Sequence, residues 1–280
     1  LTGSNYHIAY GGKGANQAVA AARSGAKVNF IGCIGDDDIG AAMKQAFTQD
    51  GINTQSIVTV NGQTTGIAMI QVADNGENCI VISAGANACL DEAIVKNFAP
   101  EIISSGYLLM QLETPLNAVI QAAKLAKANR TKVILNPAPA RPLPDELLKN
   151  VDVITPNETE AEILTGITVI DEQSAAESAR AFHAKGIPTV LITLGAKGVY
   201  VSQNGNGEII AGFRVQALDT TAAGDTFNGA FVTALLEDKS LAEAIRFAHA
   251  AAAISVTKKG AQPSIPNRME TLTFLAKHTT

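Results

Sequence analysis

The 280-residue chain is poor in charged residues, which make up only 17% of it and sum to a net charge of −5. The usual share is about a quarter, and 46% of this chain is hydrophobic, so a disordered chain or a coiled coil is excluded. No basic stripe occurs, which counts against nucleic-acid binding. No apolar run approaches the roughly 18 residues of a membrane span, so we expect no contact with a membrane.

Cysteine is scarce as well. Cys33, Cys79 and Cys89 are odd in number and have no CxxC spacing. They predict neither a disulfide framework nor a zinc site, and they fit a reducing compartment. The first residues lack the charged and apolar regions of a signal peptide. We therefore expect a cytoplasmic protein.

What is present is an alternation of strand and helix patterns along most of the chain. Helical periodicity covers 115–129, with Thr114 as its expected N-cap, and 173–186. Apolar runs without in–out alternation predict buried strands. These runs are 27–33, 107–112, 131–136, 151–155 and 188–194. The alternation predicts an α/β fold with a mostly parallel central sheet and helices on both faces.

Two stretches break this alternation. Residues 54–83 contain short β runs with turns at Asn61-Gly62 and Asn75-Gly76, and residues 199–217 look similar. Such turns are typical of antiparallel hairpins. Part of 54–83 is interpreted as a small lid or an interaction sheet.

The predicted strands end in polar groups. Ligands of an open parallel sheet bind outside the carboxyl ends of its strands. Any one polar residue there could belong to an ordinary loop, but four successive strands together favour a site. The residues at or just after the strand ends are Glu113, Asn136, Asn157 and Thr193.

A glycine-rich stretch, GGKGANQAVAAARSGA, spans residues 11–26 and leads into a helix. Gly11, Gly12 and Gly14 would expose backbone amides near the helix N-terminus, a place suited to oxygen-rich or anionic ligands. The stretch is neither a P-loop nor a GxGxxG fingerprint. A loop that serves only as a turn remains the alternative.

The most informative stretch is DTTAAGDTF, residues 219–227, which opens a buried helix. Ala222, Ala223 and Gly224 are so small that their amides could approach a phosphoryl oxygen at the positive helix end. Asp225 would lie beside the transferred group and could accept a proton from an attacking hydroxyl. The alternative is a capping aspartate.

Glu160 and His249 each have a structural interpretation as well as a functional one. Glu160 lies in the first turn of a predicted helix, where acids are common, but it could help to hold a hydrated Mg²⁺ ion that bridges nucleotide phosphates. His249 lies in an alanine-rich helix, where core packing is the better interpretation.

Together these stretches resemble the ribokinase branch of the PfkB-type carbohydrate kinases over nearly the whole chain. GGKGANQAVAAARSGA is similar to the first family signature, and DTTAAGDTFNGAF to the second. The second signature is shared by all these kinases, whereas GGKGAN, NPAPA and GAQPSIP are more specific to the ribokinase branch. TPNETEAEILTG and LITLGAKG lie where that branch has similar stretches.

The resemblance implies ATP-dependent phosphorylation of D-ribose at its 5-hydroxyl. Asp225 would be the catalytic base and would contact the sugar, and Ala222, Ala223 and Gly224 would form the anion hole. The other sugar-binding residues would be Gly12, Lys13, Gly14, Ala15, Asn16 and Glu113.

The resemblance also implies sites for ATP, for a magnesium ion and for an activating K⁺ ion. Glu160 matches the magnesium-associated acid, which acts through water. The ATP-binding residues would be Asn157, Thr193, Leu194, Gly195, Ala196, Lys197, Gly198, Gly224, Asp225 and His249. The monovalent cation would be held by Asp219, Thr221, Ser255, Lys258, Gly260 and Ser264, several of them through backbone carbonyls.

In domain terms the resemblance implies one ribokinase-like α/β domain over residues 1–280. Its β lid would be formed from about 1–10 and 54–83 and would pair two chains into a homodimer.

The chain differs from this pattern at its start. Members of the family have a strand and an Asn-x-Asp motif upstream of the glycine loop, and here only ten residues precede Gly11. Weak sugar binding by the printed chain, or a non-catalytic remnant, is therefore an alternative. Deoxyribose or another pentose is an alternative substrate. A nucleotide-binding oxidoreductase is the remaining alternative, against which the absence of GxGxxG counts.

Overall fold

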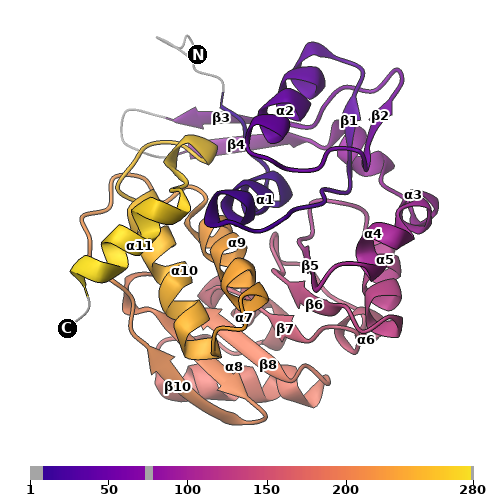
Figure 1. Cartoon of the computed structure of the whole chain (residues 1–280). Helices are drawn as coiled ribbons and strands as arrows, with labels where there is room; N and C mark the ends of the chain where they lie inside the picture. The colour runs from indigo at the N-terminus through magenta and orange to yellow at the C-terminus, as the bar shows by residue number, and fades with distance from the viewer. Residues whose placement is uncertain (1–8, 73–77, 279–280) are drawn as a thin grey trace.

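The computed structural model describes residues 9–72 and 78–278. At its centre is a six-stranded sheet with the order β10-β9-β8-β7-β6-β5 (Figure 1). Strands β5 to β8 pair in parallel, and β9 and β10 are antiparallel additions. The strands are β5 (Tyr107–Met110), β6 (Lys132–Leu135), β7 (Val153–Ile154), β8 (Thr189–Thr193), β9 (Val199–Gln203) and β10 (Asn206–Ile210). The expected α/β fold with a mostly parallel sheet is confirmed, as is the hairpin within 199–217.

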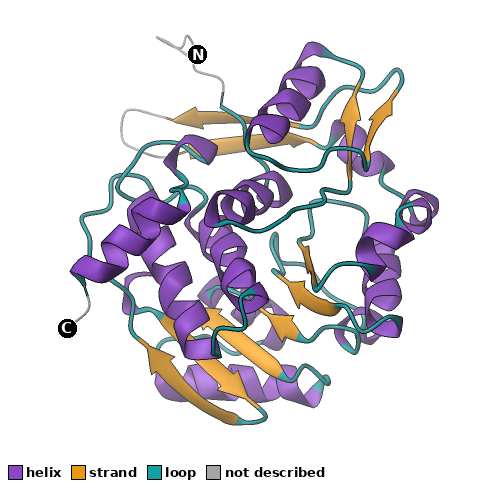
Figure 2. Cartoon of the chain, viewed as in Figure 1, coloured by secondary structure: helices purple, strands orange, loops and turns teal. Residues whose placement is uncertain are grey.

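Helices cover both faces of this sheet (Figure 2). Ile134 and Leu191 point to the side of Phe231, where α9 (Ala223–Leu236) and α10 (Leu241–Ser255) pack. Their neighbours Leu135 and Ile192 belong to the opposite layer. That layer contains α5 (Leu116–Ala128), α6 (Asp145–Leu148), α7 (Glu158–Thr165) and α8 (Glu172–Ala184). Because both faces are buried, the strands show no in–out alternation of polarity.

The expected cap of α5 is wrong. Pro115, not Thr114, is the N-cap residue, and no side chain caps this helix end. The extended ψ angle of 132° at Pro115 places Thr114 one residue outside the helix.

A second, two-stranded unit precedes the sheet. Strands β1 (Gly32–Gly35) and β2 (Ile57–Val60) pair in parallel, and α2 (Asp38–Gln49) connects them. The expectation of antiparallel pairing is therefore wrong for 54–60, because a helical crossover returns the chain in the same direction. The expected strand at 27–33 is also shifted, since pairing at Asn29 is an isolated bridge before β1 begins.

Strands β3 (Ile67–Val72) and β4 (Asn78–Ser83) form an antiparallel hairpin at the top of the view in Figure 1, apart from the six-stranded sheet. The predicted turn Asn75-Gly76 and residues 1–8 of the predicted lid lie outside the described residues. After the hairpin come η1 (Gly85–Cys89), α3 (Glu92–Asn97) and α4 (Ala99–Ile103), which lead into β5.

Helix α1 (Lys13–Ser24) packs closely against α9. The contact depends on Gly229, because a Cβ atom there would lie 2.4 Å from the Gln17 backbone oxygen and 2.5 Å from the Ala20 Cβ. Real Cβ atoms do not approach so closely, so no side chain fits at this position. The close packing brings the starts of both helices, and hence both predicted signatures, to one place.

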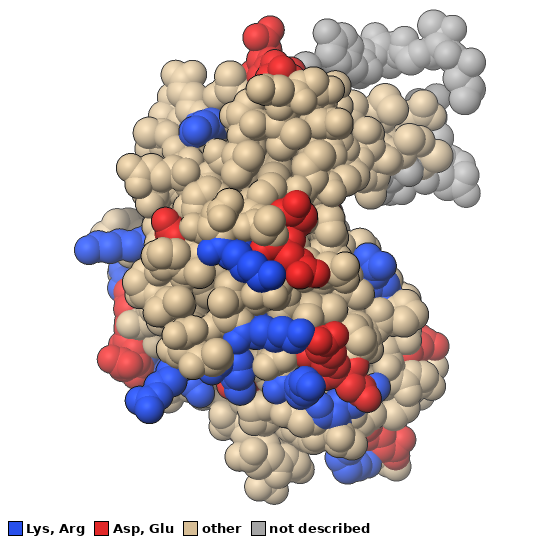
Figure 3. Space-filling view, turned by 90° about the vertical axis from the view of Figure 1, so that its right-hand side faces the viewer, with Lys and Arg blue, Asp and Glu red and all other residues tan. Residues whose placement is uncertain are grey.

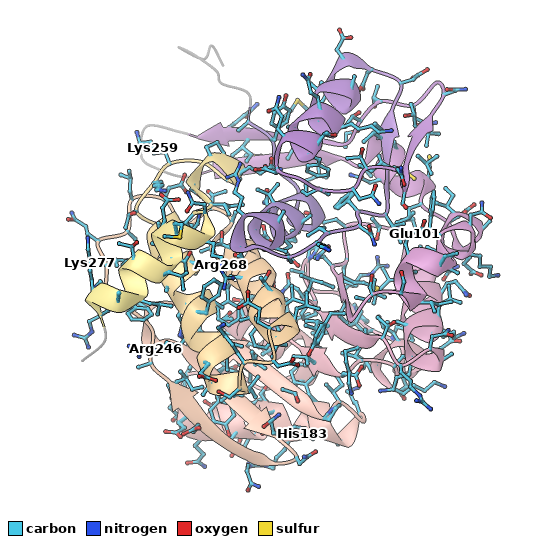
Figure 4. The ribbon with its side chains drawn as sticks, in the orientation of Figure 1. Glu101, His183, Arg246, Lys259, Arg268 and Lys277 are labelled. Atoms are coloured by element: carbon cyan, nitrogen blue, oxygen red, sulfur yellow. The ribbon has the colours of Figure 1, made fainter. Side chains whose placement is uncertain are left out.

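The last helix, α11 (Arg268–Lys277), is tied to the same pair of helices. Arg268 donates to the Ser24 carbonyl at 2.9 Å and to Glu237 at 3.1 Å, and its guanidinium lies over the Phe247 ring (Figure 4). The charged groups on the face shown in Figure 3 are interspersed in sign over its lower half. No helix in the described part of the chain is long and apolar enough to cross a membrane.

Candidate active site

Asp225 lies in the first turn of α9 and is almost completely buried. Both of its carboxylate oxygens accept side-chain hydrogen bonds from the first turn of α1. Asn16 Nδ2 donates to Oδ2 at 2.8 Å, and Gln17 Nε2 donates to Oδ1 at 2.9 Å. The two signatures, about two hundred residues apart in the chain, therefore meet at one carboxylate, which is held in a fixed orientation.

The carboxyl edge of the sheet supplies a second layer of polar contacts. Asn136, just after β6, accepts from Gln17 at 3.0 Å and donates to the Thr155 carbonyl at 2.9 Å. The Thr155 hydroxyl donates to Asn228 at 2.7 Å, and Asn228 in turn donates to the Gly224 carbonyl at 2.9 Å. The prediction that polar groups collect at this edge is thus confirmed for Asn136, and the edge also fixes the turn before Asp225.

Glu113 stands at the N-terminus of α1, where its Oε2 accepts the Lys13 backbone N–H at 2.7 Å. Gly12, the N-cap residue, has φ 91°, a left-handed conformation that favours glycine. At Gly14 a Cβ would come within 3.0 Å of the Gln111 side chain. Ala15 is buried in the core, so its methyl group is a packing group. The structure places Lys13, Asn16 and Glu113 at one end of α1, and their contact with a sugar stays a prediction.

The turn before α9 has the small residues that the sequence predicts. Ala222 is its N-cap residue with φ 59°, and Ala223, Gly224 and Asp225 form the first turn of the helix. Helices leave their first backbone N–H groups without intrahelical acceptors. Here the Thr226 N–H forms the first i to i−4 hydrogen bond of the helix, with the Ala222 carbonyl as acceptor. The Ala223 N–H donates to the Thr220 carbonyl at 3.2 Å, and the anion-binding role of this turn stays a prediction.

Asp219 lies just before this turn and connects it to Gly260 by hydrogen bonds. Its carboxylate accepts from the Thr221 N–H at 2.9 Å and from the Gly260 N–H at 2.8 Å. These bonds, first of all the contact with Thr221, hold the pKa of Asp219 below its usual range. Three of the predicted cation residues, Asp219, Thr221 and Gly260, are thereby in direct contact.

The other predicted cation residues, Ser255, Lys258 and Ser264, lie close in the chain to Gly260, which binds Asp219. Ser255 and Ser264 are buried, and their hydroxyls donate to backbone carbonyls. The Lys258 ammonium pairs with Glu270 at 2.8 Å, so its side chain is committed to α11. An ammonium group is itself positive and has no lone pair, so only the Lys258 backbone carbonyl could serve a cation.

The predicted ATP residues form two groups. Asn157 and Thr193 are joined by an isolated parallel bridge, and residues 194–198 continue from β8 as a short 3-10 turn. Gly198 has φ 115°, and a Cβ there would lie 2.1 Å from the Ile210 carbonyl, so this turn fits against the end of β10 only with glycine. His249 lies farther along, with its ring 5.4 Å from that of Phe227.

The His249 imidazole is 8% exposed, and burial lowers its pKa to about 4. The nearby Ala211 backbone raises the pKa of His249 in part, but neither ring nitrogen has a hydrogen-bond partner. The ring is therefore neutral at physiological pH. The neutral ring can pack against its neighbours or form a hydrogen bond, but it offers no positive charge to a phosphate group.

Glu160 is both a capping residue and a member of the site. Its carboxylate accepts the Asn157 backbone N–H at 2.9 Å, completing a capping box at the start of α7. Burial raises its pKa, the negative charge of Asp225 adds to this rise, and the charge of Lys13 opposes it. Lys13 and Asp225 are therefore close enough to Glu160 for their charges to act on it. Across residues 9–72 and 78–278, no group of three His, Cys, Asp or Glu side chains could ligate a metal directly, so Mg²⁺ would need water and phosphate oxygens.

Sequence reasoning missed three side chains of this site, of which Gln17 and Asn228 are buried and Gln111 is half-buried. Gln17, Gln111 and Asn228 connect Asp225 to the sheet. Gln17 and Asn228 lie within the two signature stretches, but nothing in the sequence identifies the distant partners of their side chains.

Comparison with known proteins agrees with this geometry. A model of the pfkB family of carbohydrate kinases matches residues 2–268. The chain belongs to this family.

Its relatives resemble it over nearly their whole length. A ribokinase of Haemophilus influenzae is 67% identical over 98% of this chain and 90% of its own length. A ribokinase of Staphylococcus aureus is 46% identical over 91% of this chain and 84% of its own. The structure of Arabidopsis thaliana ribokinase complexed with ribose and ATP superimposes with a TM-score of 0.91 at 37% identity, covering 95% of this chain and 87% of that one.

Proposed function

We propose that this chain transfers the γ-phosphoryl group of ATP to the 5-hydroxyl of D-ribose, giving ribose 5-phosphate and ADP. One observation carries the proposal. Beside the Asp225 carboxylate, the Asn16 Oδ1 atom is buried and has no hydrogen-bond partner. A buried acceptor without a donor is costly, and a sugar hydroxyl would supply one. The names of the relatives agree with this substrate.

The residues of this site account for the reaction as follows. The 5-hydroxyl gives its proton to Asp225 while its oxygen attacks the γ-phosphorus, and the bond to the ADP oxygen breaks. Asn16 and Gln17 keep both carboxylate oxygens of Asp225 in place during this step. The amides at Gly224 and Asp225 lie at the positive end of α9, where charge on the phosphoryl oxygens is stabilised.

The nucleotide and its magnesium ion belong on the other side of Asp225. ATP would extend along Asn157 and the turn 194–198 toward His249. Mg²⁺, when bound, screens the phosphate charge. Glu160 could take part through water, since its carboxylate lies within the electrostatic range of Lys13 and Asp225. The family resemblance and the free thiols also support a cytoplasmic location.

A coupled ADP-release assay tests the function. We expect turnover with ATP and D-ribose well above the rate without sugar. A panel with deoxyribose and other pentoses, measured at equal concentrations, identifies the preferred sugar. ADP release that does not depend on any pentose would contradict the proposal.

We also propose K⁺ as an activating ion. The contacts of Asp219 with Thr221 and Gly260 place the expected ion next to the anion-binding turn. Replacing Na⁺ by K⁺ at equal ionic strength is expected to raise the rate, because a fitting cation orders the turn that binds the phosphoryl group. Asp219→Ala should blunt this rise, whereas Asp238→Asn at the far end of α9 should keep it. Equal rates of the wild type in both salts would count against the site.

Finally, we propose that the β3–β4 hairpin is the lid and that it pairs two chains into a homodimer. Both faces of the hairpin carry exposed apolar side chains. One face bears Ile67, Met69 and Val81, and the other bears Ile70 and Ile82. Monomeric proteins rarely leave a strand pair so uncovered. One face can cover the sugar while the other meets a second chain.

A further inference from the structure

Gln17 is a deeply buried polar residue next to Asp225, with 1% of its surface exposed. Its Nε2 group donates one hydrogen to Asn136 Oδ1 at 3.0 Å and one to Asp225 Oδ1 at 2.9 Å. Its Oε1 atom accepts from Gln111 Nε2. Both hydrogens of the amide nitrogen and the amide oxygen are therefore committed to named partners.

The orientation of the Gln17 amide is fixed by these neighbours. Asn136 donates its own Nδ2 group to the Thr155 carbonyl at 2.9 Å, so it presents an oxygen, and not a nitrogen, to Gln17. The chain of bonds runs from the Thr155 carbonyl at the end of β7 through Asn136 and Gln17 to Asp225. The amide nitrogen of Gln17 must then face the carboxylate.

Asp225 is consequently held from two sides by adjacent residues of α1. Asn16 binds Oδ2 and Gln17 binds Oδ1, so the carboxylate cannot rotate without losing both bonds. The two residues differ in what else they offer. The Asn16 Oδ1 atom has no partner and could accept from a sugar, whereas each polar side-chain atom of Gln17 already has a protein partner.

We propose that Gln17 is a positioning residue for the catalytic base. Building on the proposed function, it aims the carboxylate of Asp225 at the 5-hydroxyl and makes no contact with sugar or nucleotide. Its effect on the reaction passes through Asp225. A residue that merely joins α1 to the sheet would instead affect stability or all kinetic constants together.

The test is a double-mutant cycle between Gln17 and Asp225, measured with ATP and the preferred pentose. Gln17→Met keeps the length of the side chain and removes both donors. A hydrogen bond to a charged group is lost, so we expect kcat to fall about ten- to a hundredfold. The KM for ATP should change by less than about twofold, because Asp225 is the only predicted nucleotide residue to which the Gln17 side chain hydrogen-bonds. In the Asp225→Asn background the same substitution should cause no further fall in kcat, because the carboxylate through which Gln17 acts has already been removed.

Thr233→Val is the matched control. Thr233 is buried at the same α1–α9 contact, where its hydroxyl donates to the Ala21 carbonyl at 3.2 Å, but it does not touch Asp225. We expect it to lower the thermal midpoint and to leave kcat within about twofold of the wild type. Where Gln17→Met does not fold, Gln17→Leu removes the same two donors without adding a charge, so it takes the same place in the cycle.

Three outcomes would overturn the inference. They are a wild-type kcat in a folded Gln17 variant, an equal fall in both backgrounds, and a fall in kcat that the Thr233 control shares. Failure of the proposed function is a separate result, because it would show in the wild type as an absence of pentose-dependent ADP release.

Discussion

Asp225→Asn is expected to lower kcat by about 10²–10⁴, the usual effect of removing a general base. The substitution keeps the shape of the side chain but removes its ability to accept the proton of the 5-hydroxyl. Affinity for ATP should change little, because most of the expected nucleotide contacts lie at Asn157 and 194–198. Steady-state kinetics and calorimetric titration with ATP measure the two quantities.

Asp238→Asn is the matched control for this variant. Asp238 follows the same helix, at its far end, and its φ of 56° is a conformation that asparagine tolerates. It should leave both kcat and stability unchanged. An Asp225→Asn enzyme that keeps more than a tenth of the wild-type kcat would refute the assignment of the base.

The position of this carboxylate was predictable because its signal is local. The apolar spacing after residue 225 predicts a buried helix, and α9 begins at Ala223. The strand ends were predictable for the same reason, since continuous apolar runs mark strands that are buried on both faces. Thr193 accordingly ends β8 and Asn136 directly follows β6, whereas Glu113 and Asn157 lie three residues beyond the ends of β5 and β7.

What could not be predicted depends on partners that are distant in the chain. The run at 57–60 has the composition of a strand, but its sequence does not indicate that it pairs with β1 or that the pairing is parallel. Gln17 contacts Gln111, Asn136 and Asp225, which lie 94 to 208 positions away. A side chain whose partners come from three separate elements gives no periodic signal, so its role emerges only from the fold.

Ile82→Glu is expected to weaken the proposed dimer by about 10²–10⁴ in its dissociation constant. Burying an isoleucine side chain stabilises by about 1.5–3 kcal/mol. A two-fold interface contains the residue twice, so about 3–6 kcal/mol is lost, and each tenfold change corresponds to about 1.4 kcal/mol. Ile82 is chosen because it is 69% exposed on its hairpin face, more than any other apolar side chain described there. Sedimentation velocity over a concentration series measures the change.

Ile170→Glu separates this effect from a general effect of added charge. Ile170 is 71% exposed, as open as Ile82, but it lies in the segment between α7 and α8 and outside the hairpin. It should leave the dissociation constant of the wild type unchanged. A wild type that sediments as a monomer at all concentrations would refute the dimer. Equal association of the wild type and Ile82→Glu would show that two chains meet through another surface, because a carboxylate cannot replace a buried isoleucine without cost.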